Sequence, residues 1–108
     1  MGPRYCSMSC LAALAVCTGA QVGAAETVRV TVDKLTFAPG QISAHVGDTI
    51  EWVSTDFLAH TATSRNKEWD VILQPNGSGR ITVKSGGSIE YFCRFHPNMV
   101  GQISVAGK

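Results

Sequence analysis

The sequence predicts an all-β domain, a Greek-key β-sandwich, and three of its features favour that fold class. Apolar and polar residues alternate with a period of two along most of the chain after residue 26, which is typical of strands with one buried face. Glycine-containing turn signals separate the alternating stretches. No stretch has a convincing 3.6-residue pattern of the kind that indicates an amphipathic helix. Six or seven short strands at this spacing are typical of a β-sandwich.

The strands follow from the alternation in chain order. Val28, Val30 and Val32 alternate with polar residues in the first strand, and Trp52 shares the inner face of a later strand with Ile50, so it is expected in the core. Residues 64–74 are irregular and leave room for one helical turn. The strands are expected over 27–32, 41–46, 50–54, 80–84, 89–93 and 100–105.

The beginning of the chain has the layout of a secretory signal peptide. Arg4 precedes an apolar run over 11–17, and small residues stand at 23–25. The run is shorter than the roughly 20 residues that span a bilayer, so we expect no stable membrane association. Residues 1–25 are therefore the expected leader, and residues 26–108 the expected domain. Lipidation at Cys17 is the alternative, which the bulky Val16 before it disfavours.

Composition excludes several classes of protein. Charged residues make up 16% of the chain and hydrophobic residues 44%, which argues against a disordered chain and against a coiled coil. The formal net charge is only +1, so we expect no strongly basic surface and no binding of nucleic acid.

Cys93 is the only cysteine of the expected domain, because Cys6, Cys10 and Cys17 lie in the leader. No internal disulfide can form. A secreted domain this small usually needs a disulfide, a metal or a partner to supplement its core. A metal bound by the thiolate would supply that support.

Four potential metal ligands occur at informative positions. Cys93, His96 and Met99 stand at i, i+3 and i+6, with Cys93 closing one strand and Met99 opening the next, so that one short loop presents all three side chains. His60 follows the strand 50–54. Two histidines, one cysteine and a weaker axial methionine are the ligand set of a blue-copper electron-transfer site. We therefore expect one copper ion bound by His60, Cys93, His96 and Met99.

Other interpretations of the same residues remain. A lone buried cysteine is often only a small core residue. A structural zinc site typically uses two or more cysteines and would not explain Met99. A thiol enzyme would use Cys93 as nucleophile and His96 as base, but the sequence suggests no third group to orient them. A copper enzyme needs further histidines, and His45 alternates toward solvent. We expect no enzyme.

Several segments carry a resemblance to a known family. They are the C-x-x-H-x-x-M spacing of Cys93, His96 and Met99, the approach Tyr91-Phe92-Cys93, the pair His96-Pro97, the turn Val46-Gly47-Asp48-Thr49, and the segment His60-Thr61-Ala62-Thr63-Ser64. On these residues the chain resembles the cupredoxins, and among them most closely the amicyanin/plastocyanin-like group, over essentially all of 26–108. One position departs from the pattern. Amicyanins and plastocyanins usually carry Asn directly after the upstream histidine, where it ties the two ligand loops together, and Thr61 stands there in this chain.

The resemblance implies a function. It implies a monomer with one copper ion that shuttles single electrons between periplasmic redox partners, such as a c-type cytochrome or a dehydrogenase. It also implies that the ring edge of His96 reaches the surface as the electron port, with an apolar rim of Phe57, Leu58, Phe95 and Pro97. The alternative function is a copper carrier that delivers the metal to another protein.

Overall fold

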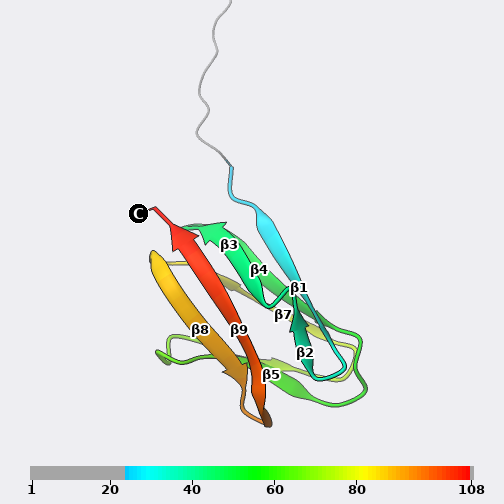
Figure 1. The fold of residues 1–108 in the computed structure, drawn as a ribbon. Coiled ribbons are helices and arrows are strands. Elements are labelled where there is room, and N and C mark those ends of the chain that lie inside the picture. Colours follow the sequence, from blue (N-terminus) through cyan, green and yellow to red (C-terminus); the bar gives the residue numbers. More distant parts are fainter. Residues whose placement is uncertain (1–23, 108) are drawn as a thin grey trace, which may run out of the picture.

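Two β-sheets lie face to face in the computed structural model, which describes residues 24–107 (Figure 1). The expected leader over 1–25 lies almost entirely outside these residues, as do Cys6, Cys10 and Cys17. The strands are β1 (Thr27–Asp33), β2 (Thr36–Ala38), β3 (Gln41–His45), β4 (Thr49–Ser54), β5 (His60–Ser64), β6 (Asp70–Leu73), β7 (Ser78–Thr82), β8 (Gly87–Cys93) and β9 (His96–Ala106).

The topology confirms the expected all-β sandwich. One sheet has the strand order β2-β1-β4-β7, and the other has the order β3-β9-β8-β5-β6. The chain crosses between the sheets after β2, β3, β4, β6 and β7. Two pairs of sequence-distant strands, β1 with β4 and β3 with β9, consequently run parallel, whereas the hairpins β5/β6 and β8/β9 are antiparallel.

The structure has more strands than the alternation predicts, and three were missed. β2 is only three residues long, too short for a periodic signal. All five residues of β5 are buried, so apolar and polar residues do not alternate along it. The irregular segment 64–74, where the sequence left room for one helical turn, instead contains β6, which pairs antiparallel with β5, and the described residues contain no helix.

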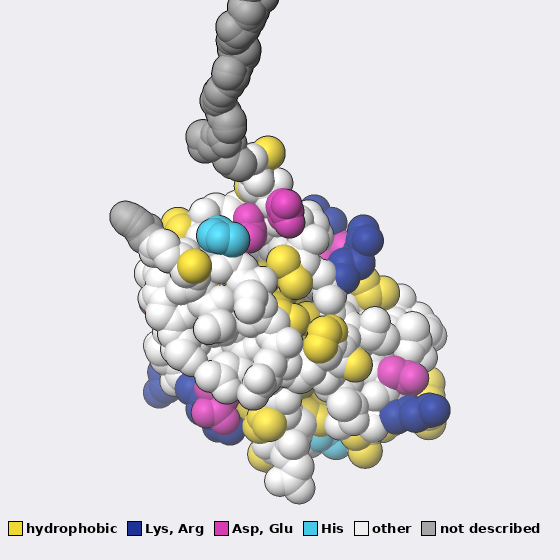
Figure 2. All heavy atoms as spheres, turned by 45° about the horizontal axis from the view of Figure 1, so that its top comes forward, with side chains coloured by type: hydrophobic (Ala, Val, Ile, Leu, Met, Phe, Trp, Pro, Cys, Tyr) yellow, Lys and Arg dark blue, Asp and Glu magenta, His cyan; other side chains and the backbone are white. Residues whose placement is uncertain are grey.

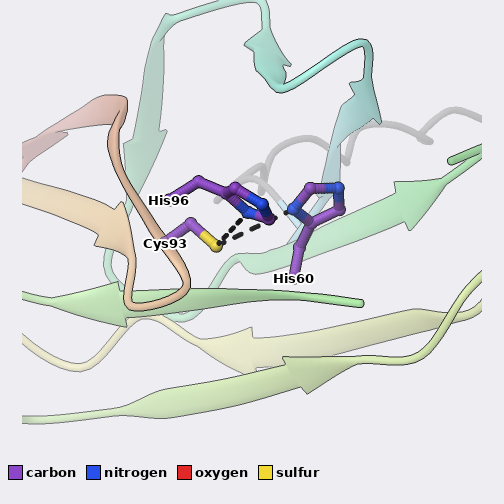
Figure 3. Close-up of side chains that lie close together, drawn as sticks. All are labelled: His60, Cys93 and His96. Carbon is purple, nitrogen blue, oxygen red and sulfur yellow. Dashed lines mark hydrogen bonds between the residues drawn. The ribbon is translucent and has the colours of Figure 1, made fainter. Parts of the chain in front are cut away.

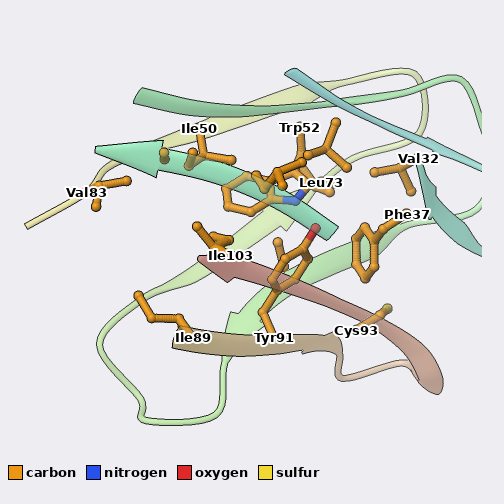
Figure 4. Close-up of a cluster of buried hydrophobic side chains, with 14 of the residues drawn as sticks. Val32, Phe37, Ile50, Trp52, Leu73, Val83, Ile89, Tyr91, Cys93 and Ile103 are labelled. Carbon is orange, nitrogen blue, oxygen red and sulfur yellow. The ribbon is translucent and has the colours of Figure 1, made fainter. Parts of the chain in front are cut away.

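Aromatic side chains fill the centre of the sandwich (Figure 4). Trp52 and Tyr91 are fully buried, and their rings meet edge to face with centroids 5.3 Å apart. Phe37 packs on the other side of Tyr91 at 4.7 Å, and Trp69 lies 5.3 Å from Trp52. Cys93 belongs to the same buried cluster, two residues along β8 from Tyr91. The strand that presents this thiol is therefore anchored by the core.

Tyr91 adds no charge beside that thiol. Burial raises the pKa of Tyr91 to about 12, and a weaker opposing effect comes from Trp52. The phenol consequently stays protonated across the physiological pH range.

Gly101 is needed because Tyr91 covers it. The two residues are Cα partners across β8 and β9, and a Cβ at Gly101 would overlap ring atoms of Tyr91. The fully buried ring has no space into which to move, so Gly101→Ala is expected to lower the free energy of unfolding by about 1–3 kcal/mol. Urea denaturation of the copper-free protein measures the change. Gly40→Ala is the matched control, since a Cβ there meets only ordinary contacts. Equal unfolding midpoints for the Gly101 variant and the wild type would contradict this packing.

Candidate metal centre

Three of the four predicted ligands lie on strand ends at one end of the sandwich. His60 is the first residue of β5, Cys93 the last of β8, and His96 the first of β9. Cys93 and His96 face each other across the tight turn between β8 and β9, at the lower end of the molecule in Figure 1. The register shifts between Phe92 and Cys93. One detail of the sequence prediction is wrong: β9 begins at His96, not at Met99, because the ladder with β8 continues to the turn.

Three donor atoms converge at this end (Figure 3). The Sγ atom of Cys93 lies 3.7 Å from Nδ1 of His60 and 3.7 Å from Nδ1 of His96. All three donors lie within 4.8 Å of one another. Ligand distances of about 2.0 Å for nitrogen and 2.3 Å for sulfur, at a trigonal angle of 120°, would separate nitrogen from sulfur by about 3.7 Å. The spacing therefore fits three ligands around one ion.

The same three side chains differ in exposure. His60 and Cys93 are fully buried, whereas His96 is partly exposed. The two imidazole rings lie 5.1 Å apart, centroid to centroid, with an interplanar angle of 54°. Of these three side chains, His96 is therefore the one that solvent reaches.

Met99 lies at the same end of the molecule. It is buried, belongs to the core cluster that includes Cys93, and lines a surface hollow together with Phe95, His96 and Pro97. The structure thus brings His60, Cys93 and His96 together and places Met99 beside them.

A buried carboxylate fixes the orientation of His60, and sequence reasoning missed it. Oδ2 of Asp56 lies 2.8 Å from Nε2 of His60. The hydrogen bond to His60 is the largest of the effects that lower the pKa of Asp56, so this group is an ionised acceptor. Nε2 must therefore donate, so in the neutral imidazole that binds a metal the lone pair is on Nδ1, the atom nearest the sulfur. Carboxylates commonly orient metal-binding histidines in this way. The position of Asp56 four residues before His60 is the only signal in the sequence.

The backbone of Thr61 contacts the sulfur directly. The N–H of Thr61 donates to Sγ of Cys93 over 3.4 Å. Such a bond stabilises negative charge on the sulfur, which is one of the means by which a protein adjusts a copper–thiolate centre.

Comparison with known proteins identifies the family. A family model described as a cupredoxin-like domain matches residues 6–105, and the chain belongs to this family. It is 24% identical to amicyanin of Paracoccus versutus over 87 residues, a match that covers 75% of this chain and 66% of that protein, just under two thirds of its length.

Solved structures share the fold. The crystal structure of amicyanin from Paracoccus versutus is 26% identical, with a TM-score of 0.66 over 74% of this chain and 81% of that one. A purple cupredoxin from Nitrosopumilus maritimus is 20% identical, with a TM-score of 0.68 over 73% of this chain and 99% of that one.

The fold, the family and the donor set together identify a copper protein similar to amicyanin. Copper is its cofactor: a thiolate and two imidazoles suit both oxidation states of this metal, and a buried thioether lies beside them. Within the described residues Cys93 is the only cysteine, so the two or more thiolates typical of a structural zinc site are not available there.

Proposed function

We propose that the protein carries single electrons, with His60, Cys93 and His96 as the strong copper ligands and Met99 as the weak axial one. The observation that supports this most is the convergence of the Cys93 sulfur with two imidazoles, each with its Nδ1 atom 3.7 Å from the sulfur, on strand ends anchored in the core. Bound copper would supply the one-electron Cu(II)/Cu(I) couple. The protein's own part is to keep its ligands in nearly the same place in both oxidation states.

The surroundings of the ligands support such a constant geometry. His60 is oriented by Asp56, and Cys93 continues a strand whose Tyr91 is locked between aromatic rings. Ligands held by buried partners rearrange little when the charge on the metal changes. The full burial of Cys93 also argues against the thiol-enzyme interpretation, because a nucleophile must reach its substrate.

The partly exposed His96 is the proposed electron port. Exposed apolar side chains stand beside His96 in the sequence, line the same hollow, or lie in the segment just before His60. We call them the apolar rim: Phe95, Pro97, Leu35, Phe57 and Leu58. Phe57 is 79% exposed. Figure 2 shows hydrophobic side chains beside a histidine at the lower end of the molecule, while charged side chains of both signs lie mainly toward the margins of that face. A redox partner such as a c-type cytochrome or a dehydrogenase would dock there.

The proposed location is the periplasm, reached through the leader at residues 1–25. Among residues 24–107, no helix is long and apolar enough to cross a membrane. We propose that the domain acts there as a monomer.

If the partner docks on the apolar rim, a charged residue placed there should slow electron exchange. Phe95→Asp is expected to slow electron exchange with the partner about tenfold, because a charge must be desolvated at the contact, while the absorption spectrum stays unchanged. Stopped-flow kinetics with the purified partner measures the rate. Val46→Asp is the matched control, since Val46 is an exposed apolar residue in the turn that follows β3, away from the ligands. Strong suppression by moderate salt, with no effect of the Phe95 change, would instead indicate a charged contact.

An electron carrier and a copper carrier differ in how they keep the metal. The copper-loaded protein should retain its copper through many cycles of reduction and reoxidation in the presence of a Cu(I) chelator, because two of the proposed ligands are fully buried. Metal content and visible absorbance after each cycle provide the measurement. Rapid transfer of copper to the chelator on the first reduction would favour the carrier function.

A further inference from the structure

We propose that a closed ring of hydrogen bonds positions Cys93 against the backbone of Thr61; the ring consists of Thr61, Thr63, Asp70 and Arg94. This proposal rests on the proposed copper site. By holding Cys93 in place, the ring would set the reduction potential of the copper and the rate at which copper is lost. We call these four residues the threonine ring. They would be positioning residues, and none of them would bind the metal.

The ring joins the two segments that carry the proposed ligands. The backbone N–H of Arg94, directly after Cys93, donates to Oγ1 of Thr61 over 2.8 Å. The Oγ1 atoms of Thr61 and Thr63 lie 2.9 Å apart, and Oγ1 of Thr63 donates to Oδ1 of Asp70 over 2.6 Å. The guanidinium of Arg94 then donates to both carboxylate oxygens of Asp70 over 3.1 Å. The path therefore begins and ends on Arg94.

Chemistry fixes the direction of every bond in the ring. The carboxylate of Asp70, paired with Arg94, can only accept, so the single proton of Thr63 must point to it. Thr61 must then donate to Thr63, which leaves its lone pairs for the N–H of Arg94. Neither hydroxyl is free to rotate. A network whose members are all satisfied is rigid, and losing one member disturbs the others.

The ring also connects β5 and β8 beyond the point where their main-chain pairing ends. β5 and β8 are paired only at Thr63 with Phe92 and at Ser64 with Tyr91. Beyond Thr63, toward His60 and Cys93, side-chain bonds hold the two strands together. Thr61 therefore joins the two ligand segments at the position where the resemblance implies Asn. Its hydrogen-bond partners here are Thr63 and Arg94.

The consequence for the thiolate follows from Thr61. Its hydroxyl holds Arg94, and its N–H donates to the Cys93 sulfur over 3.4 Å. That N–H bond lowers the electron density that sulfur can give to the metal, which favours Cu(I) over Cu(II). Without the ring, the Cys93–Arg94 segment would be free to move away from the Thr61 N–H, and the reduction potential should fall.

Thr61→Val tests the ring, because valine keeps the shape of threonine and removes the hydroxyl. Copper-loaded Thr61→Val is expected to lose copper to a chelator about tenfold faster than the wild type and to have a lower reduction potential by protein-film voltammetry. Thr61→Ser should restore both. Thr31→Val, at an exposed position of β1, is the matched control. Thr63→Val, which removes the next hydroxyl, should reproduce both effects and serves if Thr61→Val fails to fold.

A double variant tests whether the residues act as a unit. Thr61→Val combined with Thr63→Val should speed copper loss no more than Thr61→Val alone, since either change opens the same ring. The inference is overturned if the foldable variants keep the wild-type potential and release rate, even if the copper-free protein is less stable. A wild-type protein that forms no copper–thiolate band would instead contradict the proposed function.

Discussion

Copper-loaded Cys93→Ala is expected to lose the intense visible band completely. The band would arise from charge transfer between the thiolate and Cu(II), and Cys93 is the only cysteine among the described residues. The absorption spectrum of the oxidised protein, normalised to copper content, provides the measurement.

His45→Ala is the control for that experiment. His45 is the histidine outside the proposed ligand set, and its side chain is 78% exposed. This variant should keep the full band. A band that survives in Cys93→Ala would remove the sulfur from the centre and overturn the assignment.

Met99→Leu is expected to keep a thiolate band and to raise the reduction potential. Leucine fills the buried position but offers no sulfur, and loss of the axial thioether disfavours Cu(II) more than Cu(I). Each tenfold shift of relative affinity toward Cu(I) corresponds to about 59 mV. Voltammetry of wild type and variant gives the difference directly, with Ile103→Leu as the control for a volume-conserving change at another buried position of β9. Equal potentials for wild type and Met99→Leu would exclude Met99 from the ligand set.

The sequence was sufficient to predict those parts of the structure that produce a local pattern of residues. Strands with one buried face, such as β1 and β3, alternate residue by residue, and Cys93, His96 and Met99 stand close enough for their spacing to be informative. The strand β5 was missed because both of its faces are buried and its residues are mostly polar. Nothing in the local pattern distinguishes such a strand from a loop.

The surroundings of the metal centre could not be predicted in the same way. Asp70 and Arg94 are 24 residues apart, and their ion pair depends on the pairing of β5 with both β6 and β8. Sequence reasoning noticed Thr61 only as a departure from the expected Asn. Its compensating partners, Thr63 and Asp70, became visible only when the register of these strands was known.

Spectroscopy of the wild-type protein, loaded with one equivalent of copper and oxidised, tests the central claim most directly. If His60, Cys93 and His96 bind the metal together, the sample should have an intense visible band from the thiolate and a narrow-hyperfine EPR signal. A fully loaded, oxidised sample that is colourless and has the wide hyperfine splitting of ordinary Cu(II) would contradict the account.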